Sequence, residues 1–410
     1  MSHLHISPVK LMVVSRRLEL SYHRVMGDGR DEDGSIWQIG VFDSHCHPTD
    51  IMASIKDIAS MKARVLTIMA TRSQDQEMVE QTARLYPLGS PRELSDIKST
   101  RVVPAFGWHP WFSHQMYDDR STQEQPDPVE HYKSVLVPIP EDGRFLETLP
   151  APVSLRDFLQ QTEARLEEFP YALVGEVGLD RSFRLPEGPS AMTGDVTQKT
   201  GGSAEEYTPG SREGRPLTPY RVNLEHQKAI LRAQFDLAAK MGRPVSVHSV
   251  QAHGLIFEVM QGMWKGREKP SKRERRRQTD APDSTTKDDK ASGNGVAHPS
   301  LPYPPRICMH SYSGPPDALK QFLNAAVPAD IYFSFSSAIN FSNVSSAKVV
   351  KVIEEVPDDR ILVESDLHCA GERMDVLLGE IVQKVCEIKG WSLEDGARIL
   401  KRNWIKFVFG

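Results

Sequence analysis

The sequence predicts an α/β fold, a TIM (β/α)8 barrel with long loop insertions, from its length, its apolar runs and the helical patterns between them. The 410 residues exceed the roughly 250 that such a barrel needs. Eight short runs are apolar nearly throughout, as is typical of strands buried on both faces. They are Ile39–Asp43, Arg64–Ala70, Arg101–Gly107, Tyr171–Glu176, Pro244–His248, Arg306–His310, Ile331–Phe335 and Arg360–Glu364. Eight strands alternating with helices indicate a parallel sheet and favour a closed barrel.

Amphipathic helices are predicted between several of these strands. In Leu155–Phe169 the apolar residues recur on one face, and Ser154 is suited to cap its first turn. Asn223–Lys240 has the same pattern, and Gly242 ends it before the next strand. Two further predicted helices are Ala347–Glu355 and Asp375–Lys389.

The predicted barrel occupies residues 38–410, behind a lead-in over residues 1–37 that ends in a polar, Gly- and Asp-rich run and is expected to be flexible. Three stretches lack a helical period, at about 113–150, 181–219 and 262–305. They are poor in apolar residues, so we expect insertions into barrel loops rather than separate domains.

The composition excludes several classes of protein. A formal net charge of −5 does not suit a protein that coats nucleic acid with its whole surface. The four cysteines form no CxxC pair, which indicates free thiols in a reducing compartment. We see neither a secretory signal nor an apolar run of the roughly 18 residues that a membrane span needs. We therefore expect a cytoplasmic and/or nuclear protein without a membrane segment.

The strongest chemical signal is the sequence VFDSHCHPTD at Val41–Asp50. Residues two apart in a strand point to the same face, so His45 and His47 can converge on one metal ion. A lone His is more often a core or surface residue, but two at this spacing after an apolar strand favour metal binding. Asp43 is expected to support the barrel or the ligands rather than to bind metal.

Polar residues that can bind metal also follow four later strands, at the barrel face where active sites lie. Four imidazoles and two carboxylates are too many for one closed structural site. They suit two divalent ions about 3.5–4 Å apart, with Glu176 as the bridging ligand. The predicted ligands are His45, His47, Glu176, His248, His310 and Asp366, and RILVESD also places Glu364 beside the last of them.

The ordered motifs HxH, GEVGLD, PVSVHS, MHSYSG and LVESD resemble those of the TatD-like deoxyribonucleases, within the amidohydrolase-type metallohydrolases. GWHP at Gly107–Pro110 resembles that family's G-x-H-P segment. The resemblance covers about Val41 to Trp404 apart from the three insertions, and implies a TIM barrel, phosphodiester hydrolysis and the same six ligands. The long insertions resemble a fungal branch named for interacting with a TPR subunit of the anaphase-promoting complex.

The chain departs from the family pattern at two places. The family usually has HSR after the fifth strand, where this chain has His248, Ser249 and Val250. After Asp366 the family usually continues with a small residue and Pro, where this chain has Leu367 and His368. The metal positions are kept but the position of a phosphate-facing Arg is not, so the sequence supports metal binding better than it supports DNA as the substrate.

The predicted chemistry is hydrolysis by a water that two metals activate, since two cations neutralise phosphoryl oxygens and lower the pKa of bound water to near 7. Besides the bridging Glu176, we expect Asp366 to orient this water and shuttle its proton, pure ligation being the alternative. His109 is expected to contact the substrate phosphate or leaving group, the alternative being a packed turn. Trp108 and Trp111 either stack on a base or pack the loop.

The predicted cofactors are two divalent metal ions. Histidine-rich ligation favours Zn²⁺ or Mn²⁺, because Mg²⁺ prefers oxygen ligands, and the resemblance leaves Mg²⁺ open. The basic run Lys265–Arg277 is either a nuclear-localisation or phosphate-binding segment, or a solvated loop. It joins a helix to the next strand, which places it on the face away from the metals.

The predicted function is therefore a metal-dependent, exonuclease-like deoxyribonuclease with DNA as its substrate. One alternative is a metallohydrolase acting on a small ester or amide. Another is an interaction protein on a retained barrel, bound through its insertions to a cell-cycle complex. The sequence leaves open DNA versus RNA, exonuclease versus endonuclease action, the native metal and the oligomeric state.

Overall fold

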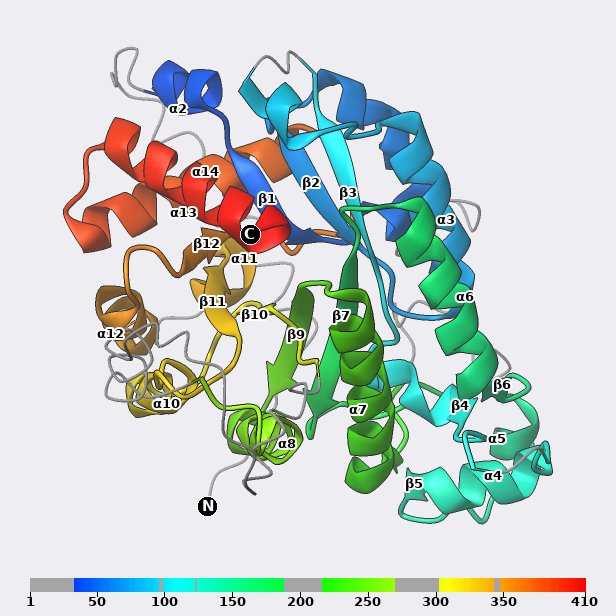
Figure 1. Cartoon of the computed structure of the whole chain (residues 1–410). Helices are drawn as coiled ribbons and strands as arrows, with labels where there is room; N and C mark the ends of the chain where they lie inside the picture. Colours follow the sequence, from blue (N-terminus) through cyan, green and yellow to red (C-terminus); the bar gives the residue numbers. More distant parts are fainter. Residues whose placement is uncertain (1–32, 96–98, 122–123, 188–215, 270–301, 343–346) are drawn as a thin grey trace, which may run out of the picture.

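The computed structural model describes residues 33–95, 99–121, 124–187, 216–269, 302–342 and 347–410. At its centre is one parallel sheet of eight strands in the order β1-β2-β3-β7-β9-β10-β11-β12 (Figure 1). The strands are β1 (Phe42–Cys46), β2 (Val65–Met69), β3 (Arg101–Phe106), β7 (Leu173–Asp180), β9 (Val245–Val250), β10 (Arg306–Met309), β11 (Asp330–Phe335) and β12 (Ile361–Val363). Each contains residues of one of the eight predicted strands.

The last strand of the sheet returns to the first. The backbone N–H of Asp366 donates to the carbonyl oxygen of His45 at 3.0 Å, and the N–H of His47 donates to that of Leu367 at 2.8 Å. These bonds join β12 to β1 at the carboxyl ends of the strands. The sheet is therefore a nearly closed barrel, and the predicted TIM-barrel fold is confirmed.

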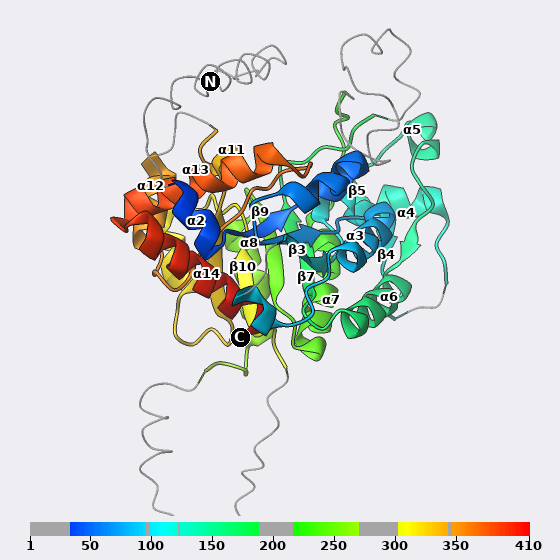
Figure 2. The same cartoon turned by 90° about the horizontal axis from the view of Figure 1, so that it is seen from above.

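Helices cover the outside of the barrel (Figures 1 and 2). The long ones are α3 (Ser73–Leu85), α6 (Leu155–Glu168), α7 (Leu224–Met241), α8 (His253–Trp264), α12 (Ala347–Glu355), α13 (Glu372–Lys389) and α14 (Leu393–Phe409). Shorter helical elements are η1 (Pro48–Ser60), η2 (Pro91–Ser95), η3 (Pro110–Gln115), α10 (Pro316–Phe322) and α11 (Ser337–Asn340). There are also two small sheets of two strands each: β4 (Met116–Tyr117) pairs with β6 (Val153–Ser154), and β5 (Leu136–Val137) pairs with β8 (Arg221–Val222).

The four predicted helices are present as α6, α7, α12 and α13. The Ser154 side chain accepts a hydrogen bond from the N–H of Asp157 at 3.0 Å, as expected for a cap. Gly242 ends α7 in a left-handed conformation with φ of 64°.

The start of the barrel differs from the prediction. Ile39 lies in helix α2 (Asp33–Ile39), and the first strand begins at Phe42 instead. Ile36 is fully buried and Trp37 packs against the same core, so this segment gains more by burying its apolar side chains as a helix against α14. Residues 33–37 of the expected lead-in are therefore helical, and residues 1–32 lie outside the described part of the chain.

The first insertion contains two helices that the sequence did not predict, α4 (Pro128–Val135) and α5 (Gly143–Glu147). Asp127 and Asp142 cap them by accepting backbone N–H bonds. Helices this short show little periodicity, which explains why the pattern missed them. Their apolar side chains form a small cluster with residues at the two ends of the second insertion: Tyr132, Val135, Leu136, Phe145, Leu146, Phe183, Leu185 and Val222.

The other two insertions lie largely outside the described residues, over 188–215 and 270–301. Of the basic run Lys265–Arg277, only residues 265–269 are described. Lys269 Nζ lies 3.2 Å from Asp330 Oδ1, at the first residue of β11. This part of the run therefore lies at the amino ends of the strands, as expected from its place between a helix and a strand.

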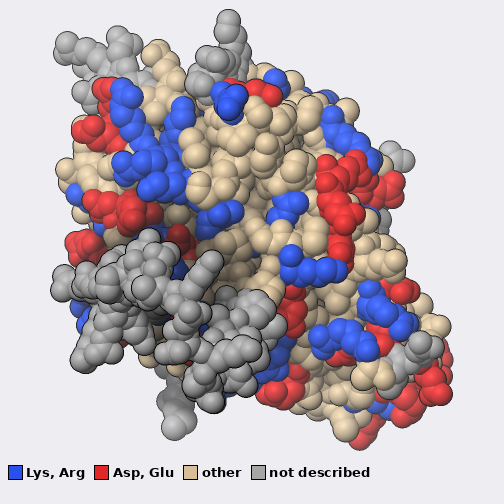
Figure 3. Space-filling view, in the orientation of Figure 1, with Lys and Arg blue, Asp and Glu red and all other residues tan. Residues whose placement is uncertain are grey.

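The described surface carries charges of both signs. Figure 3 shows Lys and Arg interspersed with Asp and Glu, and no single sign covers this face. Within the described ranges, no helix has both the length and the apolar character needed to cross a membrane.

Gly178 is required where β7 passes β9. Its φ is +156°, and a Cβ at this position would overlap the carbonyl oxygen of His248. We expect Gly178→Ala to lower the free energy of unfolding by about 1–3 kcal/mol, measured by urea denaturation. Gly262→Ala is the matched control, because Gly262 lies in α8 with open space around it and Ala favours a helix. Equal stability of the two variants would contradict the close approach.

Candidate metal centre

The six predicted ligands lie together at the carboxyl ends of five strands. His45 lies within β1, and His47 follows that strand. Glu176 lies within β7, and His248 within β9. His310 directly follows β10, and Asp366 follows β12. The four histidines and Glu176 are at most 7% exposed, and the side chain of Asp366 is 14% exposed. The side chains that the sequence placed at separate strand ends thus form one buried cluster.

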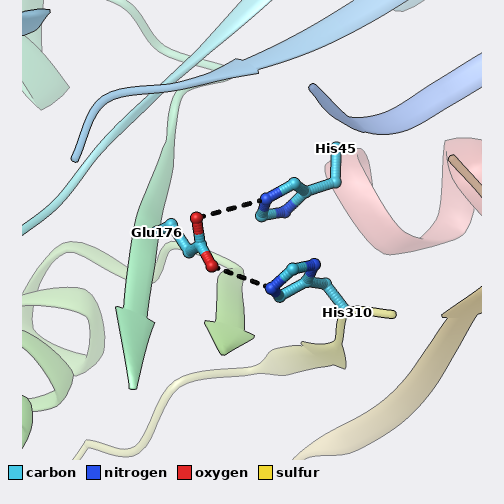
Figure 4. A group of neighbouring side chains, drawn as sticks. All are labelled: His45, Glu176 and His310. Carbon is cyan, nitrogen blue, oxygen red and sulfur yellow. Dashed lines mark ion pairs between the residues drawn. The ribbon is translucent and has the colours of Figure 1, made fainter. Parts of the chain in front are cut away.

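The Glu176 carboxylate is at the centre of this cluster. Its Oε1 lies 2.8 Å from His248 Nδ1 and 2.8 Å from His310 Nε2. Its Oε2 lies 3.4 Å from His45 Nε2 and 3.3 Å from His47 Nε2. Figure 4 shows the carboxylate between His45 and His310, with one oxygen directed at each ring.

Asp366 extends the group of donors around Glu176 Oε2. Its Oδ1 lies 3.5 Å from His47 Nε2 and 3.9 Å from His45 Nε2. By the nearer oxygen of Glu176, the donors divide into His45 and His47, with Asp366 beside them, and His248 and His310. His45 and His310 also form one possible metal-binding set with Glu176. In three-residue sets such as His45, His47 and Asp366, the potential ligand atoms lie within 4.8 Å of one another.

Second ring nitrogens of two of these histidines are held by neighbouring side chains. His45 Nδ1 lies 2.9 Å from Ser246 Oγ, and His248 Nε2 lies 3.1 Å from Asp180 Oδ2. Metal-binding histidines usually have such a partner, which fixes the ring and leaves the other nitrogen for the ion. The residues present therefore fit a metal centre.

Sequence reasoning missed the roles of Asp180 and Ser246. Each shares a strand with a predicted ligand at an even spacing, Asp180 with Glu176 and Ser246 with His248, and so points to the same face. That spacing is the signal that could have found them. Glu364 also accepts hydrogen bonds from the N–H and Oγ of Ser311, at 2.7 and 2.6 Å, and so fixes the turn after β10.

Asp43 has the supporting role that was expected. Its carboxylate accepts hydrogen bonds from the N–H groups of His45 and Ser365, both at 3.0 Å, and from Ser365 Oγ at 2.6 Å. Burial raises its pKa to about 7 despite these bonds. It ties β1 to β12 and, within the described residues, is absent from every group that could hold a metal.

The hydrogen bonds of His109 decide what its ring can do. Its Nδ1 accepts the N–H of Trp111 at 3.1 Å, so in the neutral ring the proton is on Nε2, 3.1 Å from Glu176 Oε1. Burial lowers the pKa of His109 to about 4, which keeps the ring neutral at pH 7. In this arrangement His109 donates a hydrogen bond to the centre, and with Glu176 and His248 it also forms one of the groups that could hold a metal.

The two tryptophans near His109 pack the loop. Trp108 is 2% exposed and donates from Nε1 to the carbonyl oxygen of Phe112 at 2.8 Å, so no face is open to a base. Trp111 donates from Nε1 to Asp180 Oδ2 at 2.6 Å and stacks on Phe183 with ring centroids 4.8 Å apart. Base stacking on Trp108 is therefore excluded.

Backbone strain is also concentrated here. In the described residues, positive φ outside glycine occurs at Gln251, Ser311 and Asp366, with φ of 53°, 40° and 53°. All three follow strands that carry predicted ligands. Such backbone costs about 1–3 kcal/mol per residue and is typical of functional sites.

Comparison with protein-family models shows which family the chain belongs to. The TatD-related DNase model matches residues 42–409. The chain belongs to the TatD-related DNase family. TatD proteins are metal-dependent hydrolases, which agrees with the buried donors around Glu176.

The chain is similar to two curated proteins and to a solved structure. The chain is 36% identical over 373 residues to the Cut9-interacting protein scn1 of Schizosaccharomyces pombe, which covers 90% of this chain and 98% of that protein. It is 24% identical over 331 residues to an uncharacterized deoxyribonuclease of Saccharomyces cerevisiae, covering 79% of this chain and 82% of that protein. A TatD homologue from Escherichia coli aligns over 91% of this chain and 98% of its own, at 17% identity and a TM-score of 0.49.

The charges of the TatD centre predict that metal binding depends on pH. Burial alone would lower the pKa of His47, but hydrogen bonds to Asp366 and Glu176 raise it to about 10. A metal ion needs the neutral ring, so binding must displace this proton and the affinity should rise with pH from 7 towards 10. Calorimetry of Mn²⁺ binding at pH 7.5, in buffers of different ionisation enthalpy, should detect the release of about one proton from the His47 ring.

The control for this measurement is His47→Ala, which removes the proton that the metal displaces. It should release about one proton fewer than the unchanged chain. An affinity that does not change with pH would contradict the account.

Proposed function

We propose that this TatD protein is a two-metal deoxyribonuclease that hydrolyses phosphodiester bonds of DNA in an exonuclease-like manner. The observation that carries the proposal is that two histidines face each of the two oxygens of Glu176. A diester hydrolase needs positive charge on both sides of the reacting phosphate, and two ions bridged by one carboxylate supply it. The family and the curated deoxyribonuclease relative support DNA as the substrate.

The two groups would hold one divalent cation each. His45, His47, Asp366 and Glu176 Oε2 would hold the first, and His248, His310 and Glu176 Oε1 the second. When bound, the cations neutralise phosphoryl oxygens and lower the pKa of a bound water to near 7. The nitrogen-rich donors favour Zn²⁺ or Mn²⁺ over Mg²⁺.

The protein's own groups position the reactants and move the proton. Asp366 is the most exposed of the six, at 14%, so its carboxylate is the one open to an entering water and can orient it and accept its proton. The Nε2–H of His109, which faces Glu176 Oε1 at 3.1 Å, would donate to a phosphoryl or leaving-group oxygen when substrate is bound. Asp180 holds His248 with Nδ1 directed at Glu176.

The test is cleavage of DNA labelled at one end by the purified full-length chain. We expect single nucleotides to be released progressively with Mn²⁺ or Zn²⁺, and no cleavage after chelation. Turnover of a small ester or amide without cleavage of any DNA, under every divalent metal tried, would reject the nuclease and favour the small-substrate hydrolase.

A second candidate function, protein interaction, is favoured by the apolar surface of the first insertion. Among the described residues, Val129, Val137 and Ile139 of this insertion are exposed large apolar side chains, at 37%, 50% and 65%. The relative at 36% identity is named for interacting with Cut9. We propose that this surface contacts a protein partner. The double variant Val137→Ser with Ile139→Ser should then fail to complement a strain in which the gene is deleted, while its hydrolytic activity stays intact. If His45→Ala also fails to complement that strain, hydrolysis is the essential role instead.

A further inference from the structure

Positive side chains near the metal centre differ in whether their charge is available. Arg72 lies 3.0 Å from Asp50 and 3.5 Å from Asp75, so two carboxylates already neutralise it. Lys348, near the start of α12, donates from Nζ to the backbone carbonyl oxygen of Ser313 at 2.6 Å. Over the described ranges Lys348 forms no ion pair, and its side chain is exposed. Its charge is therefore free to attract an anion.

Short contacts connect Lys348 to the metal centre. Ser313 is in the turn after His310, and its Oγ lies 3.4 Å from His253 Nε2. His253 Nδ1 lies 2.9 Å from Ser249 Oγ, on the residue next to His248. Lys348 and Ser313 thus flank the half of the centre that contains His248 and His310.

The electrostatics of His253 support this proximity. Burial, together with the smaller effects of the positive charges of Lys348 and His248, lowers its pKa to about 4. The charges of both His248 and Lys348 therefore act on the His253 ring. Val250 stands where the family pattern HSR has an arginine, so this position supplies no positive charge beside the centre.

We propose that Lys348 and Ser313, with His253 behind them, form a binding site for the phosphate next to the scissile one in a polymeric substrate. The Lys348 ammonium can give up its hydrogen bond to the Ser313 carbonyl oxygen and bind a phosphate oxygen instead. Losing this bond to a neutral group costs less free energy than breaking an ion pair would. The Ser313 hydroxyl and the His253 ring supply further hydrogen-bonding groups. The inference rests on the proposed phosphodiesterase function and adds that the enzyme recognises a chain of phosphates.

The test compares Lys348→Met with Lys351→Met on two substrates. Lys351 is on the same helix, is 65% exposed and lies 4.0 Å from Glu355, so it controls for the loss of one positive charge. With a single-stranded oligothymidylate, Lys348→Met should raise KM about tenfold and Lys351→Met should not. With bis-(para-nitrophenyl) phosphate, which has a single phosphate, neither should change KM or kcat. Lys348→Arg should keep the KM of the unchanged chain.

Binding measured without catalysis keeps this test separate from the proposed function. Anisotropy of a fluorescein-labelled oligothymidylate, with chelator present, should show weaker binding by Lys348→Met and a salt dependence of log Kd shallower by about 0.7. Equal effects of the two lysine variants, or equal loss on both substrates, would overturn the subsite. If no diester is cleaved by any form but the anisotropy difference remains, the proposed function fails and the phosphate site stands.

Discussion

Replacing Glu176 with Gln is expected to slow hydrolysis strongly and weaken metal binding at both halves of the centre. The carboxylate faces His45 and His47 with one oxygen and His248 and His310 with the other, and an amide offers only one oxygen and no charge. We expect kcat to fall by about 10²–10³-fold or more. Metal content, measured by mass spectrometry after dialysis against Mn²⁺, should fall below that of the unchanged chain.

The control is Glu168→Gln, the same chemical change in a carboxylate of α6 that is 48% exposed and pairs with Arg84. It should leave kcat and metal content unchanged, because exposed pairs contribute little. If Glu176→Gln has the same activity and metal content as Glu168→Gln, Glu176 is not a ligand of the centre.

Replacing Asp366 with Asn is expected to reduce kcat by about 10²–10⁴-fold, the contribution of a positioned general base. Hydrogen bonding with His47 and the charges of His310 and His45 outweigh burial and lower the pKa of Asp366, which keeps the side chain a carboxylate at neutral pH. Asn tolerates the positive φ of 53° at this position about as well as Asp does, so the fold should be retained. The measurement is kcat as a function of pH at saturating Mn²⁺.

Excess metal distinguishes the two roles that Asp366 can have. A residue that only binds metal loses activity through weaker binding, and high Mn²⁺ should restore it. If Asp366 accepts the proton of water, the Asn variant should stay slow at every metal concentration. Full restoration by Mn²⁺ would assign Asp366 to ligation alone.

The sequence predicted the barrel and the placement of the ligands because both depend on local pattern. Fully buried strands are apolar throughout, and parallel strands bring their carboxyl ends to one face, so residues as distant as His45 and Asp366 could be assigned to one site. The TatD motifs pointed to the same residues, and the family is confirmed over residues 42–409.

What the sequence did not predict depends on contacts between distant segments. Helix α2 replaces part of the expected first strand because Ile36 and Trp37 find a core that only the folded chain provides. The donor role of His109 follows from a backbone N–H at Trp111 that fixes the ring proton, which no spacing encodes. The free charge of Lys348 likewise depends on which acidic groups the fold leaves away from it.

The central claim, two cations held on the two oxygens of Glu176, is tested most directly by anomalous diffraction from crystals grown with Mn²⁺. We predict two peaks about 3.5–4 Å apart, one beside His45, His47 and Asp366 and one beside His248 and His310. A single peak, or peaks away from Glu176, would contradict the two-metal centre.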